Sequence, residues 1–425
     1  MKTNAVRLYG KEDLRLEEIE LPKIKEDEIL AKVVSDSICM SSFKAAKQGA
    51  DHKRIPKNVS DNPVIIGHEF AGELLEIGPK WKSKFKSGQK FSIQPALNYE
   101  KGPVGILSAP GYSYQYIGGD SEYIIIPNEV MERDCLLIYD GKGFHPASLA
   151  EPLSCVIGAM HANYHKAPGS YIHQMEIKQG GNMILMAGAG PMGLAAINYV
   201  IHREDRQPRN FIVTDIDEAR LKRAASLYIA EEAGNNGIKL QYINTSKYEN
   251  PVDELVKLTG GKGFNDVFVF APVPSLIEQA DAILAEDGCL NFFAGPSNPN
   301  FKAPFNFYSV HYKSTHVVGT SGGNNNDLKE ALLYISKGLD PSGLVTHIGG
   351  LDAVAETTLH LTEIQGGKKL IYTHIRMPLT SINDFELKRK KNAVYKKLDE
   401  ICKNHNGLWS VEAESYLLKN AGSLM

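Results

Sequence analysis

Apolar and polar positions change their pattern along the chain. Over about the first 160 residues, short apolar runs are interrupted by clusters of Gly, Pro and Asn, which typically separate strands from turns. This pattern predicts a β-rich, irregular region. Its clearest expected strands lie at residues 29–34, 64–66 and 123–126.

From about residue 182 the apolar runs alternate with segments long enough for helices. Neighbouring parallel strands must be joined by crossovers, so this alternation is typical of a doubly wound parallel sheet. The predicted fold class is therefore α/β. Its six expected buried strands lie at residues 183–187, 211–214, 240–243, 267–270, 290–294 and 317–318.

The pattern becomes mixed again after residue 319, with an expected helix at 327–337 and a strand at 369–372. Between residues 387 and 403, the apolar Val394, Leu398 and Ile401 recur at helical spacing among many lysines, which predicts a helix with one buried stripe. The basic run at 388–391 could bind phosphate. A solvated helix face is the interpretation we favour.

Composition and charge restrict the class of protein. The 425 residues include 47 Lys and Arg against 50 Asp and Glu, and this balance favours neither nucleic acid nor a membrane as partner. The five cysteines stand at least 20 residues apart, which excludes a CxxC motif and a dense disulfide framework and favours a cytoplasmic location. No apolar segment resembles a signal peptide or a transmembrane helix.

A glycine-rich motif indicates a dinucleotide site. Gly188, Gly190 and Gly193 form GxGxxG between an expected strand and an apolar helix, where they permit a tight turn, the approach of a pyrophosphate and close helix packing. Asp215 ends the next strand, at about the distance expected for the acid that binds the adenosine ribose. A carboxylate there favours NAD over NADP. Arg220 leaves NADP open, unless it is a surface residue of the following helix.

A second set of residues could bind a metal. Cys39, His68, Glu69 and Glu151 offer a thiolate, an imidazole and carboxylates, which together suit a tetrahedral zinc site. Each has an ordinary alternative, because cysteine is often buried and a His–Glu pair can lie on the surface. The four residues are too scattered for spacing alone to establish the site.

These motifs together resemble the zinc-dependent medium-chain dehydrogenases, in particular the sorbitol dehydrogenase-like branch. The resemblance covers residues 5–376 and rests on GHEFAGELLEIG, the Cys39 segment, AEPLSC and AGAGPMG followed by VTDIDEARL. Further segments, NPVIIGHEF, IQPALNY and GGKKLIYTHI among them, look most similar to reductases of L-sorbose 1-phosphate.

The resemblance implies a Rossmann doubly wound parallel sheet inserted in a β-rich, GroES-like catalytic domain. The expected parts are a first catalytic segment at 1–165, a dinucleotide-binding domain at 166–320, a catalytic return segment at 321–376 and a helical C-terminal extension at 377–425. Relatives commonly form dimers or tetramers, so a homo-oligomer is expected. The cofactor-binding residues implied are Gly188, Gly190, Pro191, Met192, Gly193, Asp215 and Arg220.

The resemblance also implies one catalytic zinc. Cys39, His68 and Glu69 would be its ligands or near neighbours, and Glu151 would exchange there with water or substrate. Ser41 would pass on the substrate proton, although it could instead be a turn or capping residue. The cysteines that bind a second zinc in many relatives are absent from residues 94–120, and Ser42 replaces a frequent acidic residue.

A sugar or sugar phosphate is the substrate implied. The expected reaction reduces L-sorbose 1-phosphate to D-glucitol 6-phosphate, or runs in reverse, and a free polyol such as sorbitol is the alternative. Lys53, Arg54 and Lys57 could bind the phosphate or lie in a solvated loop. A redox sensor that binds NAD(P) without catalysis is the alternative of another class, and the four potential zinc ligands argue against it.

Overall fold

The computed structural model describes residues 1–390 and 392–423, and it divides the chain into two compact units. The first unit combines Met1–Glu151 with Asn324–Met425, and the second comprises Pro152–Gly323. No helix among the described residues has the length and apolar character needed to cross a membrane.

The second unit is built on a six-stranded parallel sheet in the order β14-β13-β12-β15-β16-β17. This order, with the first strand at the centre and the chain winding outward on both sides, is that of a Rossmann fold. The predicted strands are all present, and several are longer than expected. Their bounds are β12 Asn182–Met186, β13 Asn210–Asp215, β14 Lys239–Asn244, β15 Phe264–Val269, β16 Leu284–Phe292 and β17 His316–Val318.

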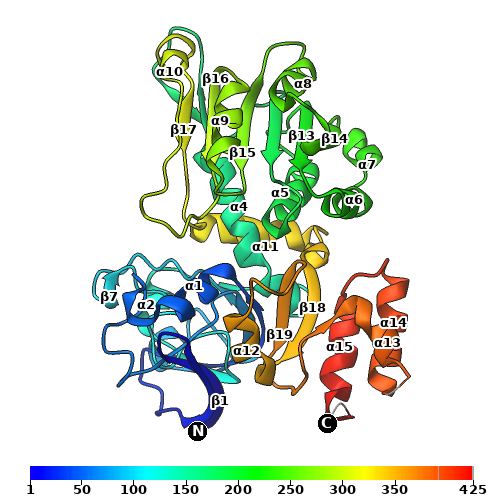
Figure 1. Ribbon diagram of the computed structural model, residues 1–425. Helices are drawn as coiled ribbons and strands as arrows, with labels where there is room; N and C mark the ends of the chain where they lie inside the picture. Colours follow the sequence, from blue (N-terminus) through cyan, green and yellow to red (C-terminus); the bar gives the residue numbers. More distant parts are fainter. Residues whose placement is uncertain (391, 424–425) are drawn as a thin grey trace. The chain divides into compact units, whose positions relative to one another are not determined.

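One part of that prediction is wrong. β17 was expected to be buried, but its Val317 is 51% exposed because β17 is an edge strand. Helices connect the strands, and Figure 1 shows α10 beside β17 at one edge and α7 beside β14 at the other. The helices are α4 Ala150–Ala162, α5 Pro191–His202, α6 Glu218–Leu227, α7 Ala230–Asn235, α8 Pro251–Lys257, α9 Pro274–Ala282 and α10 Phe307–Lys313, and a hairpin pairs β10 Tyr164–Lys166 with β11 His173–Met175.

The first unit is β-rich and draws its main sheet from both ends of the chain. The antiparallel pairing of β19 with β3 joins Tyr372 to Ser35 and Lys369 to Ile38. An eight-stranded sheet contains β3 Ile29–Ile38, β5 Phe70–Ile77, β6 Lys90–Ile93, β8 Tyr123–Ile126, β9 Leu136–Ile138, β18 Val345–Gly350, β19 Lys368–Tyr372 and β20 Thr380–Ser381. A smaller sheet contains β1 Lys2–Gly10, β2 Asp13–Glu20 and β4 Val64–Ile65. The fold is thus a Rossmann unit inserted in a β-rich unit that both ends of the chain form.

Short elements complete the first unit. They are α1 Met40–Gln48, α2 Asn128–Glu132, α3 His145–Ser148, α11 Asn325–Ser336, α12 Val354–Leu359 and the strand β7 Pro103–Ile106. The helix expected at 327–337 corresponds to α11, which starts earlier because Asn324 caps it through a capping box with Asp327.

The C-terminal segment forms three helices, α13 Phe385–Lys388, α14 Ala393–Asn404 and α15 Val411–Asn420, which Figure 1 shows grouped near β18. The predicted apolar stripe is confirmed, because Val394, Leu398 and Ile401 are buried in one core with residues of β18 and β19. The helix that carries it begins later than residue 387, since Asn392 caps the start of α14.

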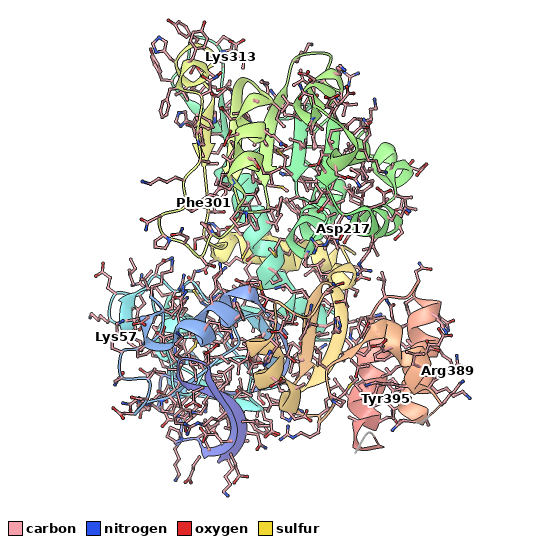
Figure 2. The ribbon with its side chains drawn as sticks, viewed as in Figure 1. Lys57, Asp217, Phe301, Lys313, Arg389 and Tyr395 are labelled. Carbon is pink, nitrogen blue, oxygen red and sulfur yellow. The ribbon has the colours of Figure 1, made fainter. Side chains whose placement is uncertain are left out.

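The basic run before α14 has local partners. Lys388 Nζ donates to Thr380 Oγ1 at 2.9 Å, and Arg389 pairs with Asp399 at 2.9 Å. Figure 2 labels Arg389 on this C-terminal segment. Lys388 and Arg389 therefore stabilise the packing of the C-terminal segment. The fourth cation of the run, Lys391, lies outside the described residues.

Candidate metal and cofactor sites

The Cys39 segment lies between the end of β3 and the start of α1. β3 ends at Ile38, and Cys39 is the N-cap residue of α1, with its carbonyl accepting from the backbone N–H of Ser42 and Phe43. The Ser41 hydroxyl, two residues along, donates to Cys39 Sγ at 3.1 Å. This turn fixes the thiol and two hydroxyl groups within one short stretch of backbone.

His68 and Glu69 belong to the same site and lie just before β5, which starts at Phe70. Gly67 precedes them with a φ of 90°, and a Cβ there would lie 2.8 Å from the Asp120 backbone nitrogen and from a carboxylate oxygen of Asp36. Only glycine suits this turn. As a result, the side-chain ligand atoms of Cys39, His68 and Glu69 all lie within 4.8 Å of one another.

Both nitrogens of the His68 ring have hydroxyl neighbours. Ser42 Oγ lies 3.2 Å from Nδ1, while Ser41 Oγ and the Tyr112 hydroxyl lie 3.2 and 3.3 Å from Nε2. Burial lowers the pKa of His68 to about 4, so the ring is neutral at pH 7 and its nitrogen lone pair is available to a metal. Ser42, at the position where the family resemblance implies an acidic residue, thus supplies a hydroxyl partner to the ring.

The three side chains suit a zinc ion. Thiolate, imidazole and carboxylate are the ligands that zinc prefers, and the group is buried or half-buried. Burial, and then the Glu69 charge, raise the pKa of Cys39 to about 12. A cation at the site would therefore be what holds the thiolate at neutral pH.

Lys368 is a component of the site that the sequence analysis missed. Its Nζ lies 2.5 and 2.6 Å from the two carboxylate oxygens of Glu69, and Ser37 Oγ donates to one of the same oxygens. Burial acts to raise the pKa of Glu69. The charge of Lys368, the His68 ring and the hydrogen bonds from Lys368 and Ser37 outweigh burial, so the pKa of Glu69 is lowered. The available signal was the pair of lysines that opens the apolar strand β19, because a buried lysine requires a partner.

Glu151 lies close to this group without belonging to it. It is the second residue of α4 and is 6% exposed. Its charge acts to raise the pKa of Cys39, Tyr112 and Lys368, which places it within electrostatic range of all three. The structure therefore gathers the four expected side chains in one region, with three of them in the ligand group itself.

A pair of buried acids supports Glu69 from behind. Asp36 Oδ1 accepts from the Glu69 backbone N–H at 3.0 Å, and Asp36 lies close enough to Asp120 for the charge of Asp120 to act on its pKa. Burial raises the pKa of both carboxyl groups, that of Asp120 to about 8. The sequence did not predict this pair, because neither Asp36 nor Asp120 lies in a motif that indicates a functional site.

The glycine motif of the second unit has the geometry of a nucleotide loop. Gly190 caps α5, Pro191 begins the helix and the half-buried Met192 follows it. A Cβ on Gly193 would lie 1.9 Å from the Gly188 carbonyl oxygen, whereas a Cβ on Gly190 would meet nothing within 4 Å. One glycine thus permits close packing, and another leaves open space at a helix N-terminus, which suits a pyrophosphate.

Asp215 lies beside this loop at the end of β13. Its carboxylate accepts from the backbone N–H groups of Ala189, Ile216 and Asp217 at 3.2, 2.8 and 3.1 Å. These bonds hold the acid at the glycine turn, where the sequence spacing placed it. Arg220 lies on α6 with its side chain 61% exposed, 3.6 Å from the Asp217 carboxylate.

The cations of the loop before His68 differ in their surroundings. Lys53 and Lys57 are exposed, and Figure 2 labels Lys57 at the outer edge of the first unit. Arg54 is half-buried, with its guanidinium carbon 5.8 Å from the centre of the Tyr112 ring. Of the three, Arg54 is the one that contacts a residue of the metal site.

Two family models match this chain. Residues 25–133 match the model of the alcohol dehydrogenase GroES-like domain, and residues 191–337 match that of the zinc-binding dehydrogenase. The chain is 48% identical to the mannitol-1-phosphate 5-dehydrogenase of Aliivibrio fischeri, with 98% of each chain covered. It is also 48% identical to the L-sorbose 1-phosphate reductase of Klebsiella pneumoniae, over 99% of this chain and 98% of that one.

A solved structure shares the fold. The 2R,3R-butanediol dehydrogenase of Bacillus subtilis aligns with a TM-score of 0.68 over 88% of this chain and all of that one. At 22% sequence identity, this likeness bears on the fold alone.

Proposed function

Because the chain belongs to the zinc-dependent medium-chain dehydrogenase family, we propose that it interconverts L-sorbose 1-phosphate and D-glucitol 6-phosphate with a nicotinamide cofactor. The observation that carries this proposal is the buried group of Cys39, His68 and Glu69, in a chain 48% identical to an L-sorbose 1-phosphate reductase over nearly its whole length. Family membership makes the protein an alcohol or polyol dehydrogenase. The phosphorylated hexose derivative is the part proposed.

Cys39 and His68 are proposed as ligands of one zinc ion, with Glu69 and Glu151 as carboxylates that ligate or stand beside it. When bound, the metal polarises a ketone oxygen or lowers the pKa of an alcohol, and the nicotinamide carries the hydride. Lys368 keeps Glu69 ionised and oriented by contacting both of its oxygens. The chain's own residues therefore define the charge and the position of the ligand atoms.

Ser41 is proposed to move the substrate proton. Its Oγ lies 3.1 Å from Cys39 Sγ and 3.2 Å from His68 Nε2, the nitrogen that the Tyr112 hydroxyl also approaches at 3.3 Å. A hydroxyl can accept one proton while it donates another, so Ser41 Oγ can pass a proton from a substrate oxygen toward Tyr112. This arrangement supports a relay over a purely capping role.

Gly188, Gly190, Pro191, Met192, Gly193 and Asp215 are proposed to bind the cofactor. The Asp215 carboxylate beside the glycine turn favours NAD, because it accepts from ribose hydroxyls and repels a 2′-phosphate. Arg220, turned toward Asp217, would have to leave that partner to bind the 2′-phosphate of NADP. Saturation kinetics with NADH and NADPH test the choice. A lower KM for NADPH would contradict it.

A second candidate substrate is mannitol 1-phosphate, oxidised at carbon 5. The observation in its favour is the equal identity, 48%, to the relative named for that activity. A panel of L-sorbose 1-phosphate, mannitol 1-phosphate, sorbitol and L-sorbose with both cofactors separates the candidates. If L-sorbose 1-phosphate turns over no faster than sorbitol, the phosphorylated substrate is wrong. If the purified protein binds NAD but neither zinc nor any substrate, a redox sensor is the better description.

Assembly and location are also proposed. Large aromatic and apolar side chains lie exposed on the β10–β11 hairpin and on α10 of the second unit, which favours a homodimer or tetramer formed through that unit. These side chains are Tyr171, Ile172, Phe307, Tyr308 and Tyr312. Sedimentation of the purified protein tests this. The five free cysteines and the need for NAD(P) favour the cytoplasm.

A further inference from the structure

The loop that precedes β4 contains Arg54, whose cationic side chain lies beside Tyr112 of the metal site. Ile55 and Val59 are buried and anchor the loop, and Ser113 Oγ donates to the Arg54 carbonyl at 2.7 Å. The loop backbone at Arg54 is therefore fixed by packing and by a hydrogen bond. A side chain that starts from such a backbone is pre-organised for binding.

The Arg54 side chain is held in place but retains free binding capacity. Its Nη1 donates to the Leu107 carbonyl at 2.9 Å, and its guanidinium lies over the Tyr112 ring. Among the described residues, no carboxylate lies within ion-pair distance of Arg54. Its charge acts on the pKa of both His68 and Tyr112, and at Tyr112 its effect exceeds the opposing effect of Glu151.

His52 stands beside Arg54 on the same tyrosine. The two rings stack, with centres 5.9 Å apart and planes 13° apart, and His52 Nδ1 accepts from the Arg54 backbone N–H at 3.3 Å. Burial, and then the charges of Arg54, Lys53 and Lys44, lower the pKa of His52 to about 4. Because Nδ1 is an acceptor, the neutral ring carries its proton on Nε2, where it can donate.

We propose that Arg54 and His52 form the phosphate subsite of the enzyme. A guanidinium without an acidic partner, next to a neutral N–H donor, suits a phosphate dianion. Both groups contact Tyr112, whose hydroxyl lies 3.3 Å from His68 Nε2, so a phosphate bound there lies one tyrosine side chain from a metal ligand. This inference rests on the proposed function and adds the residues that select a phosphorylated substrate.

The neighbouring lysines do not share the contacts of Arg54 with Tyr112. Lys53 and Lys57 line a hollow of about 490 Å³ that His52 also lines but Arg54 does not, and Lys57 Nζ donates to the Ala50 carbonyl at 2.6 Å. Lys53 therefore offers a matched control, one residue from Arg54 and of the same charge. If a diffuse positive field attracted the substrate, the two cations would contribute alike.

The experiment compares Arg54→Ala, Arg54→Lys and Lys53→Ala on phosphorylated and free substrates. With L-sorbose 1-phosphate and mannitol 1-phosphate, Arg54→Ala should raise KM by about 10- to 100-fold, since it removes charge-assisted hydrogen bonds. With L-sorbose and mannitol, kcat/KM should change by less than about threefold, and Lys53→Ala should resemble the wild type throughout. Arg54→Lys should restore part of the loss. Melting temperature and zinc content check that each variant is folded.

Three outcomes would overturn the inference. Arg54→Ala could leave KM for the phosphates unchanged, could impair free and phosphorylated substrates equally, or could be matched by Lys53→Ala. Inhibition by inorganic phosphate keeps the test separate from the proposed function. Even if the wild type shows no preference for sugar phosphates, phosphate should inhibit it competitively against the sugar and should inhibit Arg54→Ala more weakly. If inhibition by phosphate is the same in both proteins, Arg54 is not the subsite.

Discussion

Two buried glutamates of the first unit, Glu69 and Glu414, are paired with basic residues that are far away in the sequence. Lys368 is 299 residues from Glu69, and His145 is 269 residues from Glu414. Both carboxylates are almost completely buried. A buried carboxylate requires compensation, so each pair fixes the position of two distant segments relative to each other.

The two glutamates differ in what else their oxygens contact. Glu414 accepts from the backbone N–H groups of Phe144 and His145 at 2.6 and 2.9 Å, from His145 Nδ1 at 2.7 Å and from the Tyr372 hydroxyl at 3.0 Å. Glu69 instead stands beside a thiol and an imidazole. One buried pair therefore joins the C-terminal helices to the rest of the first unit, whereas the other places its acid beside two further potential metal ligands.

The strongest test of this difference makes the same substitution in both regions. Cys39→Ser should remove the zinc and lower kcat by about 1000-fold, since the metal contributes several kcal/mol to the transition state. Cys402→Ser, in the core of the C-terminal helices, should keep both zinc and kcat. Elemental analysis and initial rates measure the two effects. Full zinc content in Cys39→Ser would contradict the assignment of the metal site.

Glu414→Gln should act on stability instead. It removes the charge that compensates a buried network, and we expect the free energy of unfolding to fall by about 3 kcal/mol. Glu412→Gln, which changes an exposed acid of the same helix, should cost less than about 1 kcal/mol. Urea denaturation measures both. Equal midpoints for the two variants would show that the buried pair does not fasten the segment.

In the Lys368→Met variant, the free energy of unfolding should depend on whether zinc is bound. Without the metal, Glu69 is left buried and unpaired, which should cost about 3 kcal/mol, whereas bound zinc can take over its compensation and reduce that loss. Lys368→Arg should behave more like the wild type. Denaturation with and without a chelator checks this, and the loss in Glu414→Gln should be the same in both conditions. An equal loss in both conditions for Lys368→Met would remove the distinction.

The smallest expected effect is a change with pH in the stability difference between the wild type and Glu414→Gln. Burial acts to raise the pKa of Glu414, but His145 and the backbone N–H groups outweigh it and lower that pKa. Because the folded pKa is lowered, the stabilisation is complete above the unfolded value of about 4.3 and is lost as the pH falls through the folded value. The stability gap between the wild type and Glu414→Gln should therefore shrink below about pH 4. Urea midpoints between pH 7 and 3.5 measure it, and a constant gap would contradict the lowered pKa.

Local patterns predicted much of this molecule. Each of the six Rossmann strands is a short apolar run between helical spacers, and the buried stripe of α14 follows from the spacing of Val394, Leu398 and Ile401. The burial of β17 was mispredicted because apolar runs look alike at the centre and at the edge of a sheet. Edge position depends on strand order, which a single strand does not encode.

The candidate site was less predictable than the fold. Cys39, His68, Glu69 and Glu151 were found through the resemblance of their motifs to a family, and spacing alone left them open. Lys368 and the Asp36–Asp120 pair escaped notice because their partners are set by sheet pairing between distant segments. Arg54 was found among three cations, but its distinction from Lys53 rests on contacts with Tyr112 that no local pattern contains.

The pairing of β3 with β19 has a consequence for the order of folding on the ribosome. The Rossmann unit is one continuous stretch of chain and can fold as soon as it has emerged, whereas the metal site lacks Lys368 until the chain has grown 299 residues beyond Glu69. At about 5–20 residues per second, this delay lasts on the order of 15–60 s. For that time the nascent chain exposes an unpaired edge of β3 and an uncompensated acid, so chaperone contact should concentrate on the first 151 residues.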